Sequence, residues 1–195
     1  MIKGHRIFLI ALIAIAAIGF FFTGDPSTEP KDSIPLAPAT TRSHAYIGDF
    51  EKETDKIHAK IRKYCRGAKK ISPAQPPVFG KLYGCIGGEA ETAKVFVNAD
   101  PIYGNVINIK VMWNDWFIDI GYGLHADKIE AMEMAMAILD LYVPDQPADQ
   151  RQELLTTFLS GNIGKVFKYN DLSIEYRYTR GPKIDERLLI IERGK

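Results

Sequence analysis

The chain has 195 residues, of which 46% are hydrophobic and 25% are charged. These values are ordinary for a globular protein with room for one domain, and they exclude a collagen-like repeat or a largely disordered chain. The 25 basic and 24 acidic residues give a formal net charge of +1. Such a balance provides no bulk positive field to attract a polyanion, so we expect no nucleic-acid partner.

An apolar segment, Ile7 to Phe22, follows the basic residues Lys3 and Arg6. This layout is typical of a secretory signal or a signal anchor. As a helix the segment spans ~24 Å, slightly less than a ~30 Å hydrocarbon core. Because Asp25 and Glu29 follow it, the positive-inside bias predicts a cytoplasmic N-terminus and a domain that faces outward. The membrane is therefore the first predicted partner, through residues 7–22.

The chain is predicted to have three parts: a signal anchor or signal peptide at 1–24, a linker at 25–43, and an extracytoplasmic α+β domain at 44–195. Four prolines among small and polar residues make the linker a semi-extended tether. No small-x-small cleavage site closes the apolar segment, which favours a single-pass protein of the bacterial inner membrane. The alternative is a secreted or periplasmic protein released by cleavage.

Hydrophobic periodicity predicts a first helix after Ser43, its expected N-cap, with an end near Cys65 and Gly67. β-branched and aromatic residues then predict a run of strands. These predicted strands cover residues 78–86, 92–98, 106–113 and 116–120. The turn-forming pair Asn114-Asp115 is expected to separate the last two.

A helical period returns at 127–142, where Asp127 and Glu130 resemble a capping box. The residues expected to share its core stripe are Ile129, Met132, Met136, Leu139 and Val143, whereas Met134 is expected on a flank. A second helix is predicted at 147–160, so that the two form a hairpin. The alternating tail from Lys165 to Arg193 is strand-like.

The order of helix, strands, two helices and strands predicts an α+β fold. We expect an antiparallel sheet of two strand groups, about five to seven strands in all, because the predicted turns are short. An N-terminal helix and the central helical hairpin are expected to cover it.

The only cysteines are Cys65 and Cys85. In an exported domain they are expected to pair, and closing a loop of about twenty residues stabilises a fold by ~3 kcal/mol on the chain-entropy account. The Cys-x-x-Cys spacing of a redox-active pair is absent.

Four residues are candidate binding residues: Trp113, Asp115, Trp116 and Tyr122. Two indoles on either side of a predicted turn, next to polar groups, suit a contact with a sugar or a protein. The alternative is that the tryptophans are simply buried at strand ends, which is the commoner situation.

Catalytic chemistry has little support in the sequence. No phosphate-binding loop, dinucleotide fingerprint, metalloprotease helix or serine-hydrolase elbow is present. We therefore expect no cofactor and no metal, and the catalytic residues are unknown. Carboxylates at Asp115 and Asp119, with His125 nearby, leave open a small periplasmic enzyme such as a cell-wall hydrolase.

The leading hypothesis is an envelope protein anchored once in the membrane, whose outward domain binds another envelope component in an accessory or assembly role. It depends on the combination of anchor, tether and compact domain without a catalytic motif. The alternatives are the periplasmic enzyme and a secreted ligand-binding module.

Overall fold

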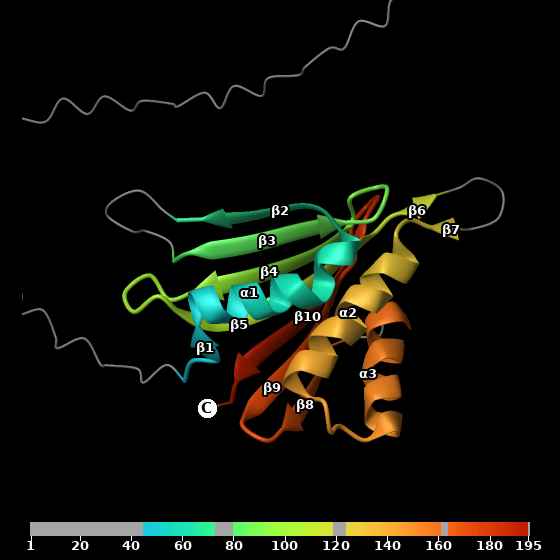
Figure 1. The fold of residues 1–195 in the computed structure, drawn as a ribbon. Helices are drawn as coiled ribbons and strands as arrows, with labels where there is room; N and C mark the ends of the chain where they lie inside the picture. The colour runs from blue at the N-terminus through green and yellow to red at the C-terminus, as the bar shows by residue number, and fades with distance from the viewer. Residues whose placement is uncertain (1–44, 73–79, 119–123, 161–163, 195) are drawn as a thin grey trace, which may run out of the picture. The chain divides into compact units, whose positions relative to one another are not determined.

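The computed structural model describes residues 45–72, 80–118, 124–160 and 164–194 (Figure 1). The chain separates into residues 1–41 and 42–195, and all described residues belong to the second unit. The predicted anchor at 7–22 and the linker at 25–43 lie outside the described residues. Within the described ranges, no helix has both the length and the apolar character needed to cross a membrane.

The first half of the domain contains β1 (Gly48–Asp49), α1 (Phe50–Ile61), the 3₁₀ turn η1 (Arg62–Tyr64), β2 (Cys65–Ile71), β3 (Leu82–Gly87), β4 (Ala93–Ala99), β5 (Asn105–Asp115), β6 (Phe117–Ile118) and β7 (Leu124–His125). The second half contains α2 (Lys128–Tyr142), α3 (Ala148–Ser160), β8 (Lys165–Tyr169), β9 (Leu172–Thr179) and β10 (Asp185–Arg193).

The main sheet is antiparallel, with the order β2-β3-β4-β5-β10-β9-β8 and with β1 paired to β5. All three α-helices lie on one side of this sheet (Figure 1). The predicted α+β fold with an antiparallel sheet is therefore confirmed. With eight strands the sheet is one strand larger than the upper expectation.

Two strands of this sheet were not predicted. One is the short β1, and the other is β2, in a segment that we expected to be the end of the first helix and a loop. Its residues Lys69 and Lys70 pair with Gly84 and Tyr83 of β3. Lys70 also binds Glu51 and Asp55 at 2.8 Å. Lys69 and Lys70 therefore lie on an edge strand, where lysines disfavour pairing with another chain.

The first helix starts later than predicted. Asp49, and not Ser43, is its N-cap, because the Asp49 side chain accepts a hydrogen bond from Lys52 N at 3.0 Å. The preceding residues pair with β5, where Ile47 N donates to Val106 O at 2.9 Å. Strand pairing thus competes successfully with the helical periodicity that begins at Ile47.

The core lies between the sheet and the helices. Representative residues with no exposed surface are Ile57, Val95, Val111, Ile138 and Phe158, one from each of α1, β4, β5, α2 and α3. The hairpin of α2 and α3 and the alternating burial of β9 agree with the sequence prediction.

The predicted core stripe of α2 is wrong in three positions. Met134, expected on a flank, is fully buried, whereas Met136 is 40% exposed and Ile129 is 64% exposed. Small residues at Ala131 and Ala135 share the buried face. Because α2 is apolar on nearly every side, its periodicity could not indicate which face would meet the sheet.

The predicted capping box of α2 is also absent. Asp127 has a left-handed backbone (φ 53°) and its side chain makes no helix-capping hydrogen bond. Its carboxylate instead accepts hydrogen bonds from Ala90 N at 3.1 Å and from Thr92 N at 2.9 Å. A Cβ at Gly88 would lie only 2.0 Å from this carboxylate, so Asp127 anchors the β3–β4 turn to the start of α2.

The predicted disulfide is present: Cys65 and Cys85 are bonded, with a Cα–Cα distance of 5.6 Å. It joins the start of the edge strand β2 to β3 across a loop that includes residues 73–79, which lie outside the described ranges.

Replacing both cysteines, Cys65→Ser with Cys85→Ser, is expected to lower the free energy of unfolding by about 3 kcal/mol, because the unfolded chain loses a cross-link of about twenty residues. Urea unfolding of the oxidised protein measures the difference. Reductant should destabilise the wild type by a similar amount and leave the double variant unchanged. Equal stability of the two oxidised proteins would contradict the expectation.

Candidate functional site

The predicted turn at residues 114–115 is wrong, because β5 runs without interruption to Asp115. In the register, Trp113 lies opposite Arg187 and Asp115 lies opposite Asp185 of β10. Alternation along the strand turns Trp113 and Asp115 to the same, helix-covered face. The exposed fraction is 1% for Trp113 and 5% for Asp115, but 42% for Trp116.

The four candidate binding residues therefore do not form one surface. Trp113 and Asp115 share a buried cluster, Trp116 is at the surface, and Tyr122 lies outside the described residues. The Trp113 indole N–H donates to Ala126 O at 2.9 Å, and its ring lies 6.0 Å from the His125 ring. Trp113 thus connects β5 to the segment that leads into α2.

Arg187 is the centre of the buried cluster. Its guanidinium lies 5.1 Å from the Trp113 ring and 5.3 Å from the Tyr178 ring. These two residues flank Arg187 in the register of β5, β10 and β9. Arg187 Nε donates to Asp115 Oδ2 at 2.9 Å, and Nη2 donates to the same oxygen. The positive charge of Arg187 is therefore neutralised by Asp115, and its guanidinium lies between the rings of Trp113 and Tyr178.

Sequence reasoning missed Arg187. The signal was available, because Arg187 alternates with Leu189 and Ile191 on β10 and so occupies an inward position. A charged residue in such a position requires a buried partner of opposite charge. The sequence offers several carboxylates, and only the pairing of β5 with β10 selects Asp115.

The second oxygen of Asp115 contacts His125. Asp115 Oδ1 is hydrogen-bonded to His125 Nδ1, and the His125 side chain is 34% exposed. An aspartate that orients a histidine is one component of a hydrolytic triad. Here, however, the Asp115 side chain is 3% exposed and both of its oxygens are engaged. It is therefore suited to holding β5, β7 and β10 together, and less suited to acting as a general base on a substrate.

Nucleophiles and metal ligands give no further support to catalysis. Both cysteines are in the disulfide. In the described part of the chain, no three His, Cys, Asp or Glu side chains are grouped as metal ligands would be. Asp119, the other candidate carboxylate, lies outside the described ranges.

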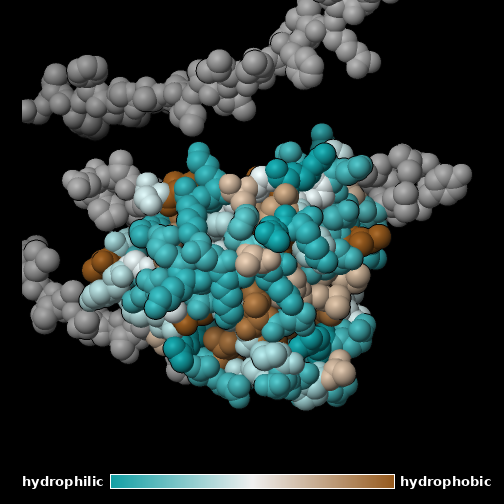
Figure 2. Space-filling model, viewed as in Figure 1, coloured by the Kyte–Doolittle hydropathy of each residue, from teal (hydrophilic) through white to brown (hydrophobic). Residues whose placement is uncertain are grey.

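A groove of about 510 Å³ lies between the end of α1 with η1 and the outer face of α2. Its lining residues are Lys60, Lys63, Tyr64, Met132, Glu133, Met136, Ala137 and Asp140. Lys60 Nζ lies 3.6 Å from Asp140 Oδ2 across the groove. On the helix side of the domain, hydrophobic surface gathers between α1 and α2 amid a mostly hydrophilic surrounding (Figure 2). Sequence reasoning missed this groove because it assigned Met132 and Met136 to the core.

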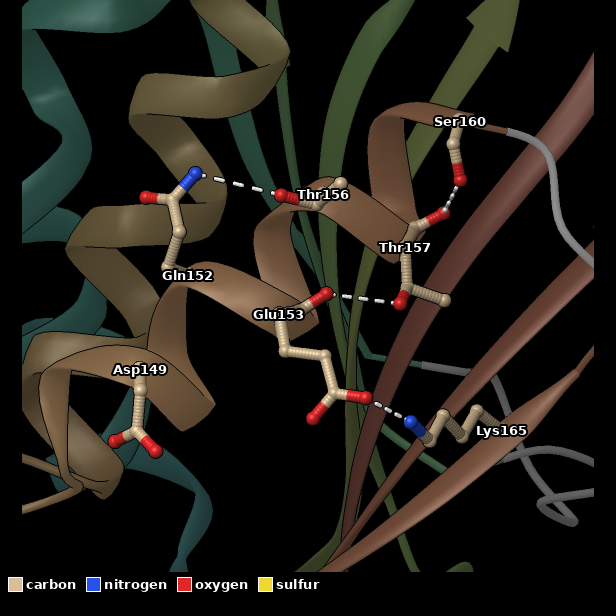
Figure 3. Close-up of a pocket in the computed structure, with 7 residues that line it drawn as sticks. All are labelled: Asp149, Gln152, Glu153, Thr156, Thr157, Ser160 and Lys165. Carbon is tan, nitrogen blue, oxygen red and sulfur yellow. Dashed lines mark hydrogen bonds and ion pairs between the residues drawn. The ribbon is translucent and has the colours of Figure 1, made fainter.

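A second hollow, beside α3, is lined by polar and charged residues (Figure 3). Glu153 binds Lys165 of β8 at its centre. Gln152 Nε2 donates to Thr156 Oγ1 at 3.3 Å, and Thr157 Oγ1 donates to Glu153 O at 2.8 Å. The hydroxyls of Thr157 and Ser160 thus donate to backbone carbonyls of α3, and Gln152 donates to Thr156, which is ordinary for the outer face of a solvated helix.

The substitution Asp115→Asn is expected to lower the free energy of unfolding by about 3 to 5 kcal/mol, because it leaves the buried guanidinium of Arg187 without its counter-charge. Chemical denaturation measures the loss. The matched control is Glu175→Gln, which breaks the exposed pair with Arg177 and should have an effect below ~1 kcal/mol. Similar losses in both variants would contradict a special role for the buried pair.

Tyr83 predicts a pH dependence of stability. It is 2% exposed, and its hydroxyl lies 2.9 Å from His58 Nδ1. Burial raises the pKa of Tyr83 to about 12, whereas the phenol of the unfolded chain ionises near its ordinary pKa of about 10. The stabilisation by the neutral phenol is therefore fully present below about pH 10 and is lost as the pH rises towards 12.

Between about pH 9 and about pH 11.5, wild type is expected to lose roughly 2 kcal/mol more stability than Tyr83→Phe. Urea unfolding at both pH values gives the two differences. The comparison concerns the pH-dependent change, because the variant also lacks the contact with His58. Parallel losses in the two proteins would overturn the assignment.

Comparisons with known proteins do not indicate a function for this chain. No protein-family model, curated protein or solved structure matches the chain.

Proposed function

We propose that this chain is a bacterial envelope protein, held in the inner membrane by residues 7–22, whose outward domain binds another envelope protein as an accessory or assembly factor. The binding site is the groove between α1 and α2. The observation that carries the proposal is the uncovered apolar stripe on α2, formed by Ile129, Met132 and Met136.

The apolar surface of α2 is larger than the core of the domain requires. Its inner face already supplies the core, through Met134, Ala135 and Ile138. Ile129 and Met136 are nevertheless 64% and 40% exposed. Apolar residues three and four positions apart on the outward side of a helix are the pattern expected of a second buried face. This favours a partner that covers the stripe.

The chemistry of the groove favours a protein partner. Methionine side chains are flexible and polarisable, and they adapt to the shape of an apolar ligand. Lys60, Lys63, Glu133 and Asp140 provide a charged rim of both signs. An apolar floor with a polar rim is the usual anatomy of a protein interface. A groove between two helices suits an amphipathic helix, whose residues three and four apart would reach the two methionines.

The position of the domain outside the cytoplasm is supported by two features. The basic residues precede the apolar segment in the sequence, which favours export of the chain beyond that segment. The Cys65–Cys85 disulfide belongs to an oxidising compartment. The cell-wall hydrolase is less well supported, because Asp115 is enclosed by Arg187 and His125.

A photoreactive amino acid at Lys63, on the rim of the groove, is expected to crosslink in whole cells to one envelope protein, within a segment whose apolar residues recur every three or four positions. Adding Met132→Glu should abolish the adduct, because it places a charge on the groove floor. Mass spectrometry of the adduct identifies the crosslinked segment.

The matched control is Thr156→Glu, on the exposed face of α3, which should leave the adduct unchanged. An adduct that survives Met132→Glu, or that maps to a segment without the apolar period, would refute the groove as the binding site.

A further inference from the structure

The face of the sheet opposite the helices is a second unpartnered surface. We call it the open face, and its central residues are Ile86, Lys94, Phe96, Lys110, Met112, Leu188 and Ile190. Their positions follow from the register, because each alternates with a residue that faces the helices. Ile86 is 37% exposed. Ile190 is only 2% exposed, whereas Phe96, Met112 and Leu188 are partly exposed. Apolar side chains thus occupy the middle of a face that no helix in the described chain covers.

Charge is distributed unevenly across the open face. The β2–β5 half carries Lys69, Lys94 and Lys110, none of which forms an ion pair within the described residues. The β10–β9 half carries Glu175, Glu186 and Glu192, and the one arginine there, Arg177, is bound by Glu175 at 2.7 Å. A cationic half therefore adjoins an anionic one, although Lys168 on the outer strand β8 adds one positive charge at the edge.

We propose that two copies of this chain pair through their open faces, around a two-fold axis that runs parallel to the strands between β5 and β10. This axis places β5 of one copy over β10 of the other. Each residue keeps its position along the strand direction. Met112 of one copy then faces Leu188 of the second copy, because these residues are opposite each other in the register. Lys110 faces Ile190 of the second copy, with Glu192 one step further along the same face.

Charge complementarity selects this axis. A two-fold axis perpendicular to the strands would place the cationic half of one copy on the cationic half of the other, which is unfavourable. The parallel axis places Lys110 of each copy beside Glu192 of the other. Lys94 then lies opposite Arg177, whose charge is already neutralised by Glu175. An isologous contact of this kind closes as a dimer and does not continue into a filament.

The route of the chain selects the same axis. The domain begins at β1, where Gly48 pairs with Val106 near the start of β5. An axis parallel to the strands leaves this end of both domains on the same side. Two copies anchored in one membrane can then pair with their linkers directed the same way. This argument alone rests on the proposed membrane anchoring.

The size of the face predicts a dimer of modest affinity. Six strands spaced ~4.8 Å apart, with about seven residues each at ~3.3 Å, present ~600 Å² per copy. The total of ~1,200 Å² is at the lower limit of stable protein interfaces. Packing of two sheets through their faces also requires an apolar centre, which the partly exposed side chains of Met112 and Leu188 provide.

Sedimentation of the full-length protein in density-matched detergent, over a range of concentrations, tests the dimer. Lys110→Glu and Glu192→Lys are each expected to raise the dissociation constant at least about tenfold, because each places like charges together across the interface. The double variant should return to within about threefold of wild type, since the exchanged charges again meet their opposites.

The matched control is Lys52→Glu, on the exposed surface of α1, which should not change the dissociation constant. Thermal unfolding of each variant confirms that the fold is retained. The proposal would be overturned if the wild-type protein stayed monomeric at every concentration, or if the single charge reversals did not weaken the dimer. It would also be overturned if the double variant had a dissociation constant as high as the single variants. None of these substitutions touches the α1–α2 groove, so this test and the crosslinking test fail independently.

Discussion

The pairing of β5 with β10 is the constraint on which the rest of the fold depends. It joins two strand groups that are separated in the sequence by both helices of the hairpin, and so converts them into one sheet. The buried pair of Asp115 and Arg187 lies at one end of this pairing. A slip of one residue would move Arg187 to the opposite face and leave Asp115 unpaired. The ion pair therefore specifies the register, whatever its net contribution to stability.

The same cluster shows how a group of catalytic residue types can serve a structural purpose. Asp115, His125 and Trp113 are residues found in many active sites. In this domain both oxygens of the Asp115 carboxylate are hydrogen-bonded, one to Arg187 and one to His125. The Trp113 indole N–H is hydrogen-bonded to Ala126 O. A general base needs an oxygen directed at a substrate. The contacts instead bind together β5, β7, β10 and the entrance to α2.

The surfaces with unexplained apolar character lie elsewhere, on opposite sides of the domain. The α1–α2 groove is on the helix side, and the open face is behind the sheet. Under the two proposals made above, one side binds a partner and the other binds a second copy of the chain, so each dimer would present two partner sites. Two linked sites raise the effective concentration for any partner that is itself repeated or membrane-bound.

The sequence by itself determined the fold class, the helical hairpin, the alternating strands of the tail and the disulfide. These features depend on local periodicity, on turn residues and on the presence of only two cysteines. Only the tertiary structure decided the burial of Met134 in place of Met136, the role of Asp127, the strand at Cys65–Ile71 and the partner of Arg187. Each of these depends on contacts between segments distant in the chain. A helix that is apolar on nearly every side, or a strand with three basic residues in seven, carries no local signal of which contact will form.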